Sequence, residues 1–347
     1  MKEKLKIYFK KYLIDAMGAM AQGLFASLLI GTIFSTIGKY TGIAFFGELN
    51  SYAAGATGMA IGAAVAYSMK AHPLVIFSAA TVGGAGYAIG MDVEKIGAAG
   101  EIYHAAAGPA GAFIAVIIAV ELGMLVSKKT RVDILVTPAV TVLSGVLAAK
   151  LISPGIGWLM YMLGHFVNTA TEYHPFFMGI VISVVVGMVL TLPISSAALC
   201  SMIGIAGIAG GAAAVGCCCQ MVGFAACSFR ENRWSGLVSQ GLGTSMLQMG
   251  NICRHPQIWL PPTLAAAICG PLSTVLFRLE CEGVAAGMGT CGLVGPIGIL
   301  AASGMGAGSW LGIGLLCVLM PAALSVLFTE LMKRLGWVRD GYMKLDA

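Results

Sequence analysis

Long apolar stretches with almost no charge recur along this chain and determine the environment in which it can fold. Of its 347 residues, 58% are hydrophobic and only 10% are charged, whereas soluble domains carry roughly 25% charged residues. A helix needs about 20 apolar residues to cross a bilayer. The sequence therefore predicts an all-α polytopic membrane protein with about ten transmembrane helices, at residues 18–37, 53–69, 74–91, 107–127, 134–153, 175–194, 196–209, 211–228, 258–277 and 310–331.

Two glycine-rich segments in the last third of the chain differ from these spans. Gln240–Gln248 and Gly287–Gly295 are flanked by apolar residues but interrupted by glycines. Backbone that leaves helical geometry at membrane depth must be buried in protein or line a wet cavity, because lipid cannot satisfy its N–H and C=O groups. Broken helices of this kind form solute sites in transporters. We therefore predict two re-entrant hairpins, 236–254 and 286–303, with a solute site between them.

The distribution of positive charge predicts the orientation of the chain. Lysine and arginine are enriched in cytoplasmic loops of membrane proteins. On this rule the loops expected in the cytoplasm are 2–11, 70–72, 128–131, 230–233, 254–255 and 333–344, and those expected outside are 39–50, 92–101, 172 and 278–282. We expect a bacterial cytoplasmic (inner) membrane protein with both termini in the cytoplasm. A net charge of +5 distributed in this way predicts no direct nucleic-acid binding.

One segment leaves two interpretations open. Residues 196–228 form either two short crossings or one long helix, and a single crossing would reverse the charge rule for every loop downstream. The stretch 155–172, with its aromatic and polar side chains, is typical of an amphipathic helix at the lipid headgroups.

These observations predict five regions along the chain. Prolines and glycines interrupt the second half far more than the first, which favours the second half as the binding apparatus. The regions are an amphipathic N-terminal segment 1–17, a scaffold and dimer-interface domain 18–154, an interfacial linker 155–174, a transport domain 175–331 and a cytoplasmic tail 332–347.

The ten cysteines all lie in the second half of the chain and do not predict a metal site. Their spacing lacks the pairs that zinc sites use. Cys217, Cys218 and Cys219 are consecutive, and consecutive helical residues point about 100° apart, so they cannot converge on one ion. The motifs of nucleotide hydrolases, metalloproteases and serine hydrolases do not occur. We predict no metal, no cofactor and no enzymatic activity.

Several motifs, taken in order, resemble a known family. They are Val132–Pro138, Leu151–Gly157, the turn Leu192–Ala198, and Gly241–Ser245 followed by His255-Pro256 and Trp259–Pro262. They are similar to motifs of the IIC permeases of the bacterial phosphoenolpyruvate-dependent sugar phosphotransferase system (PTS). The similarity is closest to the branch of the clostridial regulator of perfringolysin O production, and more distant to fructose-type permeases over residues 134–296.

The resemblance implies a homodimer in which a transport domain moves a solute across the membrane by an elevator-like displacement. In sugar-transporting relatives a separate IIB protein or domain phosphorylates the sugar. We expect no IIA or IIB domain in this chain, because only about 16 residues follow the last predicted span. The expected partners are a small polar solute, a second copy of the chain, membrane lipid, and a separate IIB protein or a cytoplasmic regulatory protein.

The chain departs from the fructose-type pattern at two places. Where those permeases carry the sequence Gly-Ile-Thr-Glu-Gly, this chain has Gly241–Ser245 and lacks the carboxylate; the turn Thr191–Ala198 likewise lacks their lysine. Recognition here would use hydroxyl and amide groups rather than the stronger charge-assisted hydrogen bonds.

Polar residues in and near the interrupted segments are the candidates for solute binding. A neutral polar solute needs both donors and acceptors, and hydroxyls and amides supply them. The alternative is that the same side chains satisfy backbone freed by the breaks, or join helices. The candidates are Ser195, Ser196, Gln220, Thr244, Ser245, Gln248, Asn251, Gly289 and Thr290.

Charged residues supply a second group of candidates, for coupling or gating. Glu121 falls inside a predicted span, where it would either couple transport to protons or pair locally near Lys128 and Lys129. Residues 230–233, which are Arg230, Glu231, Asn232 and Arg233, precede the first hairpin. They form either a solvated loop or a surface that docks a soluble partner or gates the hairpin.

Two functions follow from the sequence. The first is a PTS EIIC-like permease that binds and translocates a sugar or polyol by alternating access. The second is a membrane sensor that uses the same binding architecture to control gene expression indirectly through a cytoplasmic partner.

Overall fold

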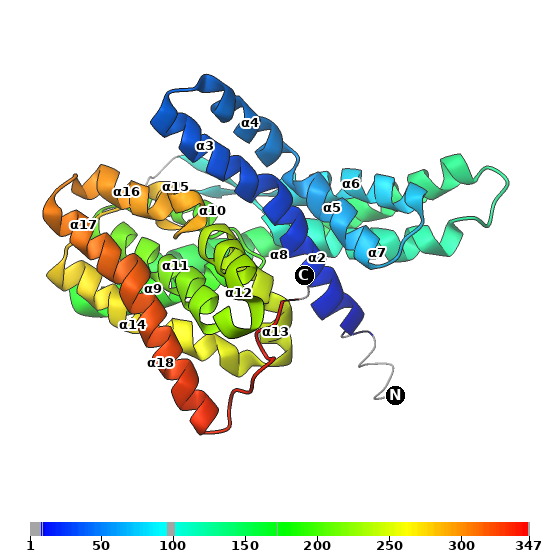
Figure 1. Cartoon of the computed structure of the whole chain (residues 1–347). Helices are drawn as coiled ribbons and strands as arrows, with labels where there is room; N and C mark the ends of the chain where they lie inside the picture. The colour runs from blue at the N-terminus through cyan, green and yellow to red at the C-terminus, as the bar shows by residue number, and fades with distance from the viewer. Residues whose placement is uncertain (1–7, 9, 96–100, 172, 346–347) are drawn as a thin grey trace. The chain divides into compact units, whose positions relative to one another are not determined.

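The computed structural model describes residues 8, 10–95, 101–171 and 173–345 (Figure 1). The chain divides into two compact units. The first unit comprises Met1–Val93 and His104–Met160, and the second comprises Glu94–Tyr103 and Tyr161–Ala347. The predicted tail ends 1–7 and 346–347, and the loop residues 96–100 and Glu172, lie outside the described residues.

The first unit consists of helices and one two-stranded hairpin. A continuous helical run from residue 10 to residue 41 opens it, without a break at the boundary expected near residue 17. Its elements are η1 (Lys10–Asp15), α2 (Ala16–Leu24), η2 (Phe25–Leu29), α3 (Ile30–Thr41), α4 (Ala44–Gly55), α5 (Thr57–Ser68), α6 (Pro73–Ala88), β1 (Gly90–Glu94), β2 (Ile102–Ala106), α7 (Gly108–Val126) and the first part of α8 (Asp133–Ala170).

The second unit comprises residues 94–103 and the chain from within α8 onward. It is built around α11 (Gly207–Cys227), which packs against α9, α14 and α18. The other elements are α9 (Pro175–Thr191), α10 (Ser196–Met202), α12 (Phe229–Val238), η3 (Ser239–Gly243), η4 (Ser245–Gln248), α13 (Met249–Arg254), η5 (Pro256–Trp259), α14 (Leu260–Pro271), η6 (Leu272–Leu276), α15 (Gly283–Ala286), η7 (Cys291–Leu293), α16 (Val294–Ser303), α17 (Ala307–Ile313), η8 (Gly314–Leu319) and α18 (Met320–Arg334).

Within the described residues, six helices are long and apolar enough to cross a membrane by length and composition. They run over 10–39, 108–126, 133–170, 207–227, 256–276 and 307–334, and shorter apolar helices cover 73–88, 175–191 and 291–303. The chain is therefore an all-α integral membrane protein apart from its small hairpin, as the sequence predicted.

Two predicted elements differ from the structure. The separate helix expected over 155–172 is instead the second half of α8, which continues through Pro154 to Ala170. The crossing expected at 196–209 is wrong. Because α10 has seven residues and a helix rises 1.5 Å per residue, it reaches only about 10 Å and cannot span a bilayer.

The segment 196–228 follows neither of its two interpretations, because it consists of one short helix, α10, and one helix long enough to cross a membrane, α11. Pro175, at the start of α9, accepts a hydrogen bond from Thr274 at 2.8 Å. The carbonyl of Gly207, at the start of α11, accepts one from the Cys281 N–H at 3.1 Å. The chain thus enters through α9, turns, and returns through α10 toward the end of the unit from which it came. The expected sidedness of the downstream loops is compatible with this path and stays a prediction.

The boundary between the units falls inside the predicted linker 155–174, at Met160. Residues 94–103 were expected in the scaffold domain but belong to the second unit. The reason is local, since the Tyr103 hydroxyl donates to the carbonyl oxygen of Ala198 at 3.3 Å. The roles of the two units as scaffold and transport domains remain predictions.

Glycines allow the helices of the second unit to approach closely, as small residues do in membrane proteins. A methyl group at Gly216 of α11 would overlap the backbone of Ser183 in α9. Gly314, by contrast, has no atom within 4 Å of the position its Cβ would take.

We predict that Gly216→Ala lowers the stability of the purified protein, while Gly314→Ala does not. Both substitutions improve helix propensity by about 1 kcal/mol, so the pair isolates the steric effect, which costs about 1–3 kcal/mol when a packed core is overfilled. The midpoint of thermal unfolding in detergent measures the difference. Equal midpoints for the two variants would contradict the packing described for α9 and α11.

The hairpin of β1 and β2 carries an exposed ion pair. His104 Nδ1 lies 2.6 Å from Asp92 Oδ1, and its Nε2 lies 3.0 Å from the Ala88 carbonyl oxygen. Both ring nitrogens face acceptors, and only the protonated ring donates from both. The hydrogen bond to Asp92, reinforced by that to Ala88, therefore raises the pKa of His104 above its ordinary value.

We predict that Asp92→Asn lowers the pKa of His104 toward about 6.5, the value of an unperturbed histidine. Because the folded pKa is raised, the pair stabilises the hairpin fully below the unfolded pKa and loses its effect as the pH rises through the folded pKa. Imidazole chemical shifts followed by NMR across this range measure the change. Glu48→Gln is the control, and an unaltered titration in Asp92→Asn would refute the pairing.

Candidate functional site

Three interruptions of helical backbone meet against α11 in the second unit. They are the turn 192–195 between α9 and α10, the extended residue Thr244 between η3 and η4, and the loop 287–293 between α15 and α16. We call them together the break cluster. η3 packs against η7, and both η4 and α16 pack against α11. The helices are therefore interrupted in both segments where the sequence predicted it, 236–254 (the first broken segment) and 286–303 (the second broken segment). The two segments are in contact through η3 and η7.

The turn between α9 and α10 follows from its proline and serines. Leu192 precedes Pro193 and is extended, as a residue before proline prefers. The Ser195 hydroxyl accepts from the Ala198 N–H at 3.2 Å and so caps α10. The Ser196 hydroxyl donates to the carbonyl oxygen of Gly287 at 2.7 Å. This last bond joins the turn to the second broken segment.

The first broken segment bends sharply at Thr244, whose φ of −159° and ψ of 142° are those of a strand. Its hydroxyl oxygen accepts from the Met246 N–H at 3.1 Å, which replaces a bond lost at the break. The next residue, Ser245, is fully buried. Thr244 thus serves the backbone, and Ser245 points its hydroxyl to Thr191, 2.9 Å away.

The second broken segment depends on glycines in the left-handed region. Gly289 has φ +55° and Gly292 has φ +51°. A Cβ on Gly289 would lie 2.8 Å from the backbone carbon of Cys217, so this loop rests directly on α11. Thr290 is buried, and its hydroxyl lies 3.6 Å from Met221 Sδ.

A directional chain of hydrogen bonds runs beside two of these breaks, because it includes Thr191, just before the turn 192–195, and Ser245, just after Thr244. Thr191 donates to Gln220 Oε1 at 3.4 Å, so the 2.9 Å contact with Ser245 has Ser245 as its donor. Gln220 Nε2 donates to Thr263 at 3.0 Å, and Thr263 donates to the Trp259 carbonyl oxygen at 2.7 Å. We call these five residues the hydroxyl chain. Such chains reinforce one another in a low dielectric, and this one offers neutral donors and acceptors without a carboxylate.

Three members of the hydroxyl chain, the side chains of Thr191 and Thr263 and the carbonyl group of Trp259, were not among the predicted site residues. Thr191 is the last residue of α9 before Leu192-Pro193, a position from which a hydroxyl reaches the turn that proline forces. That signal was present in the sequence. Thr263 sits in α14 behind a pair of prolines, and nothing local indicates that it faces Gln220.

Two predicted site residues lie in a different network. Gln248 Nε2 donates to Gln240 Oε1 at 2.9 Å and to the Met343 carbonyl oxygen at 2.9 Å. Asn251 Nδ2 donates to Gln248 Oε1 at 2.8 Å and to the Lys344 carbonyl oxygen at 2.9 Å. An amide nitrogen has two hydrogens, so in this conformation neither residue has one left for a solute.

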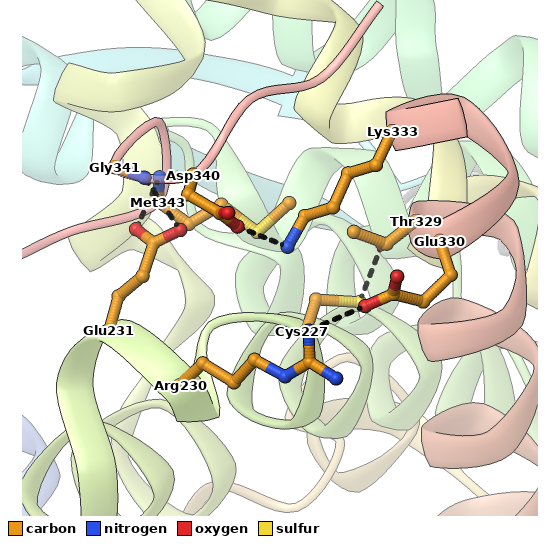
Figure 2. A network of polar contacts seen from close by, with 9 residues as sticks. All are labelled: Cys227, Arg230, Glu231, Thr329, Glu330, Lys333, Asp340, Gly341 and Met343. Carbon is orange, nitrogen blue, oxygen red and sulfur yellow. Dashed lines mark hydrogen bonds and ion pairs between the residues drawn. The ribbon is translucent and has the colours of Figure 1, made fainter. Parts of the chain in front are cut away.

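The charged residues that precede the first broken segment contact the C-terminal part of the chain (Figure 2). Arg230 pairs with Glu330 of α18 at 3.2 Å. Both carboxylate oxygens of Glu231 accept backbone N–H groups, from Gly341 at 2.9 Å and Met343 at 3.0 Å. Asn232 bonds to the same segment, and Arg233 has a left-handed φ of 53°.

Glu121 belongs to the first unit and has local partners there. Its Oε1 accepts from the ammonium group of Lys11 and from the Tyr12 hydroxyl, the latter at 2.8 Å. The carboxylate therefore pairs with the first helical run rather than with Lys128 or Lys129. Proton coupling through Glu121 stays a prediction.

The cysteines are free thiols, and eight of the ten are buried. Among the described residues, no group of three or more histidine, cysteine or acidic side chains is placed to hold a metal ion.

The structure is thus that of an integral membrane protein with interrupted helices buried inside one unit, an arrangement that occurs in transporters. A family model described as "Phosphotransferase system, EIIC" matches residues 14–345. The chain therefore belongs to this family, whose members are sugar-type membrane permease components and are not catalytic by themselves. No curated protein and no solved structure matches the chain.

We predict that Gly289→Ala disorders the second broken segment. An alanine at a φ of +55° is strained, and its Cβ would meet the backbone of Cys217; strain of this kind costs about 1–3 kcal/mol. Hydrogen exchange of the amides in 287–293 should accelerate by at least about tenfold.

Gly306→Ala is the matched control, because no atom lies within 4 Å of its Cβ position. If Gly289→Ala left the exchange of 287–293 as slow as in this control, the loop would not rest on α11 in the way described.

Proposed function

We propose that this protein is a PTS permease component that binds a small neutral polar solute, a sugar or a polyol, at the break cluster and translocates it by alternating access. Membership of the EIIC family supports the transport class. The observation that carries the choice of site is the hydroxyl chain, a largely buried set of hydroxyl and amide groups beside the interruptions at 192–195 and Thr244.

The chemistry of the hydroxyl chain suits a polyol. A sugar hydroxyl both donates and accepts, so it can take the place of Thr191 as a partner of Ser245, or of Thr263 as a partner of Gln220. Exchanging one hydrogen bond for another changes the free energy little, whereas leaving a buried group unpaired costs about 1–3 kcal/mol. A site of this kind binds selectively but releases its solute.

In our proposal, the broken segments are where the backbone changes conformation during alternating access. Gly289 and Gly292 occupy backbone conformations that other residues resist. In our proposal, the second unit is the transport domain, and its elevator-like displacement in a homodimer exposes the site to each side in turn. Phosphorylation of the sugar is carried out by a separate IIB protein at the cytoplasmic face.

A sensor is the second candidate function, in keeping with the similarity to the branch of the perfringolysin O regulator. The observation that favours it is the link between the predicted cytoplasmic residues and the first broken segment. Gln240 in η3 bonds to Gln248, which in turn bonds to the C-terminal segment. Solute binding at the break cluster would then change the C-terminal segment, and a cytoplasmic regulatory protein bound near Arg230 and Arg233 would detect this change.

We predict saturable binding of one or more neutral hexoses or hexitols to the purified protein, measured by isothermal titration calorimetry across a panel of such compounds. Gln220→Leu removes the central member of the hydroxyl chain and should weaken this binding by at least about tenfold, since an unpaired buried hydrogen-bonding group costs about 1–3 kcal/mol.

Thr169→Val, which alters an exposed hydroxyl in α8, should bind like the unaltered protein. Binding that survives in Gln220→Leu would place the solute elsewhere. Binding without uptake into proteoliposomes, even with an added IIB protein, would favour the sensor.

A further inference from the structure

The segment that follows α18 doubles back along the second unit. We call residues 335–345 the strap. It turns at Gly336, with φ +76°, and at Gly341, with φ +93°. Lys333 pairs with Asp340 at 2.6 Å across the first turn (Figure 2). The strap therefore leaves the helix along a defined path.

Apolar side chains fix the strap to the unit. Val338 and Met343 are each only 2% exposed and pack in one cluster with Phe224, Ile252 and Ile258. The ring of Tyr342 stacks on His255, with centroids 3.6 Å apart. Two side chains of the strap thus occupy the interior of the unit, beside the first broken segment.

Five polar side chains bind the main chain of the strap. Gln257 donates to the Trp337 carbonyl oxygen at 3.1 Å, and the other four hold residues 341–345. The N–H groups of Gly341 and Met343 donate to Glu231, and the Leu345 N–H donates to Asn232 Oδ1 at 2.8 Å. The Met343 carbonyl accepts from Asn232 at 2.8 Å and from Gln248 at 2.9 Å. The Lys344 carbonyl accepts from Asn251 at 2.9 Å. All six bonds to residues 341–345 go to backbone atoms, so this part of the strap is held mainly through its main chain.

We propose that Glu231, Asn232, Gln248 and Asn251 form a peptide-binding clamp whose ligand is the chain's own strap, held releasably across the first broken segment. Met343 gives the clamp its side-chain selectivity, because it fills the apolar cluster between the polar contacts. This inference goes beyond the proposed function and does not depend on it.

Release of the strap would change the first broken segment. With the strap bound, the amide hydrogens of Gln248 and Asn251 are fully used. Gln248 also holds Gln240, whose amide nitrogen donates to Ser228 at 2.9 Å and to Gly236 at 3.0 Å. Departure of the strap therefore frees one amide hydrogen on Gln248 and one on Asn251. Gln248 is bonded to Gln240 of η3, the element that contacts η7 in the break cluster.

Hydrogen exchange of the full-length protein, followed by mass spectrometry, tests the clamp. In the unaltered chain the amides of 341–345 should exchange at least about tenfold more slowly than in a free peptide of the same sequence, yet faster than those of α11. Combined replacement Glu231→Ala and Asn232→Ala should remove most of this protection. Glu282→Ala, an exposed acidic residue in the same unit, is the control and should have no effect.

A second variant keeps the test decisive if the double variant misfolds. Met343→Asp leaves all four clamp residues intact and should release the strap while α11 stays protected. Exchange of 341–345 at the rate of a free peptide in the unaltered protein would refute the clamp. If the amides of 341–345 exchanged as slowly as those of α11, the strap would be a permanent part of the fold and would not be released.

Discussion

Lipid cannot form hydrogen bonds with peptide groups, and the second unit is organised by this constraint. Three helices are interrupted at Leu192–Ser195, Thr244 and 287–293, and each interruption exposes N–H and C=O groups. The structure brings them together against the buried helix α11, where Ser195, Ser196 and Thr244 satisfy the freed groups. Polar groups gathered away from lipid in this way can also form hydrogen bonds with a polar solute. The need to satisfy the interrupted backbone therefore explains both the packing of the second unit and the location of the proposed site.

The sequence predicted the membrane class, both broken segments and several residues of the break cluster, because each depends on local signals. Apolar length marks the spans, and glycines mark the breaks. Long-range contacts were not predictable. Gln248 and Asn251 bind the main chain of residues 343 and 344. The residues next to Gln248 and Asn251 in the sequence do not indicate these distant partners. Thr263 was missed for the same reason. The partial return of α10 was missed because apolar composition does not distinguish a short helix from a crossing.

The break cluster and the clamp are joined through a short series of amides. Gln240 lies in η3, next to the break at Thr244, and Gln248 lies four residues beyond it. These two amides bond to each other, and Gln248 bonds to the strap. A change at either end alters the partners available at the other. Such a connection is useful to a permease that must respond to a soluble partner, and equally to a sensor.

In our proposal, a solute binds where the three interruptions lie together. A cryo-electron microscopy map of the purified protein in a lipid nanodisc, saturated with a hexose or hexitol that it binds, would locate this solute. We expect solute density that touches Gln220 or Ser245 and lies against the loop 287–293. Uninterrupted helices through 239–248 and 287–293, or solute density remote from both, would contradict this proposal.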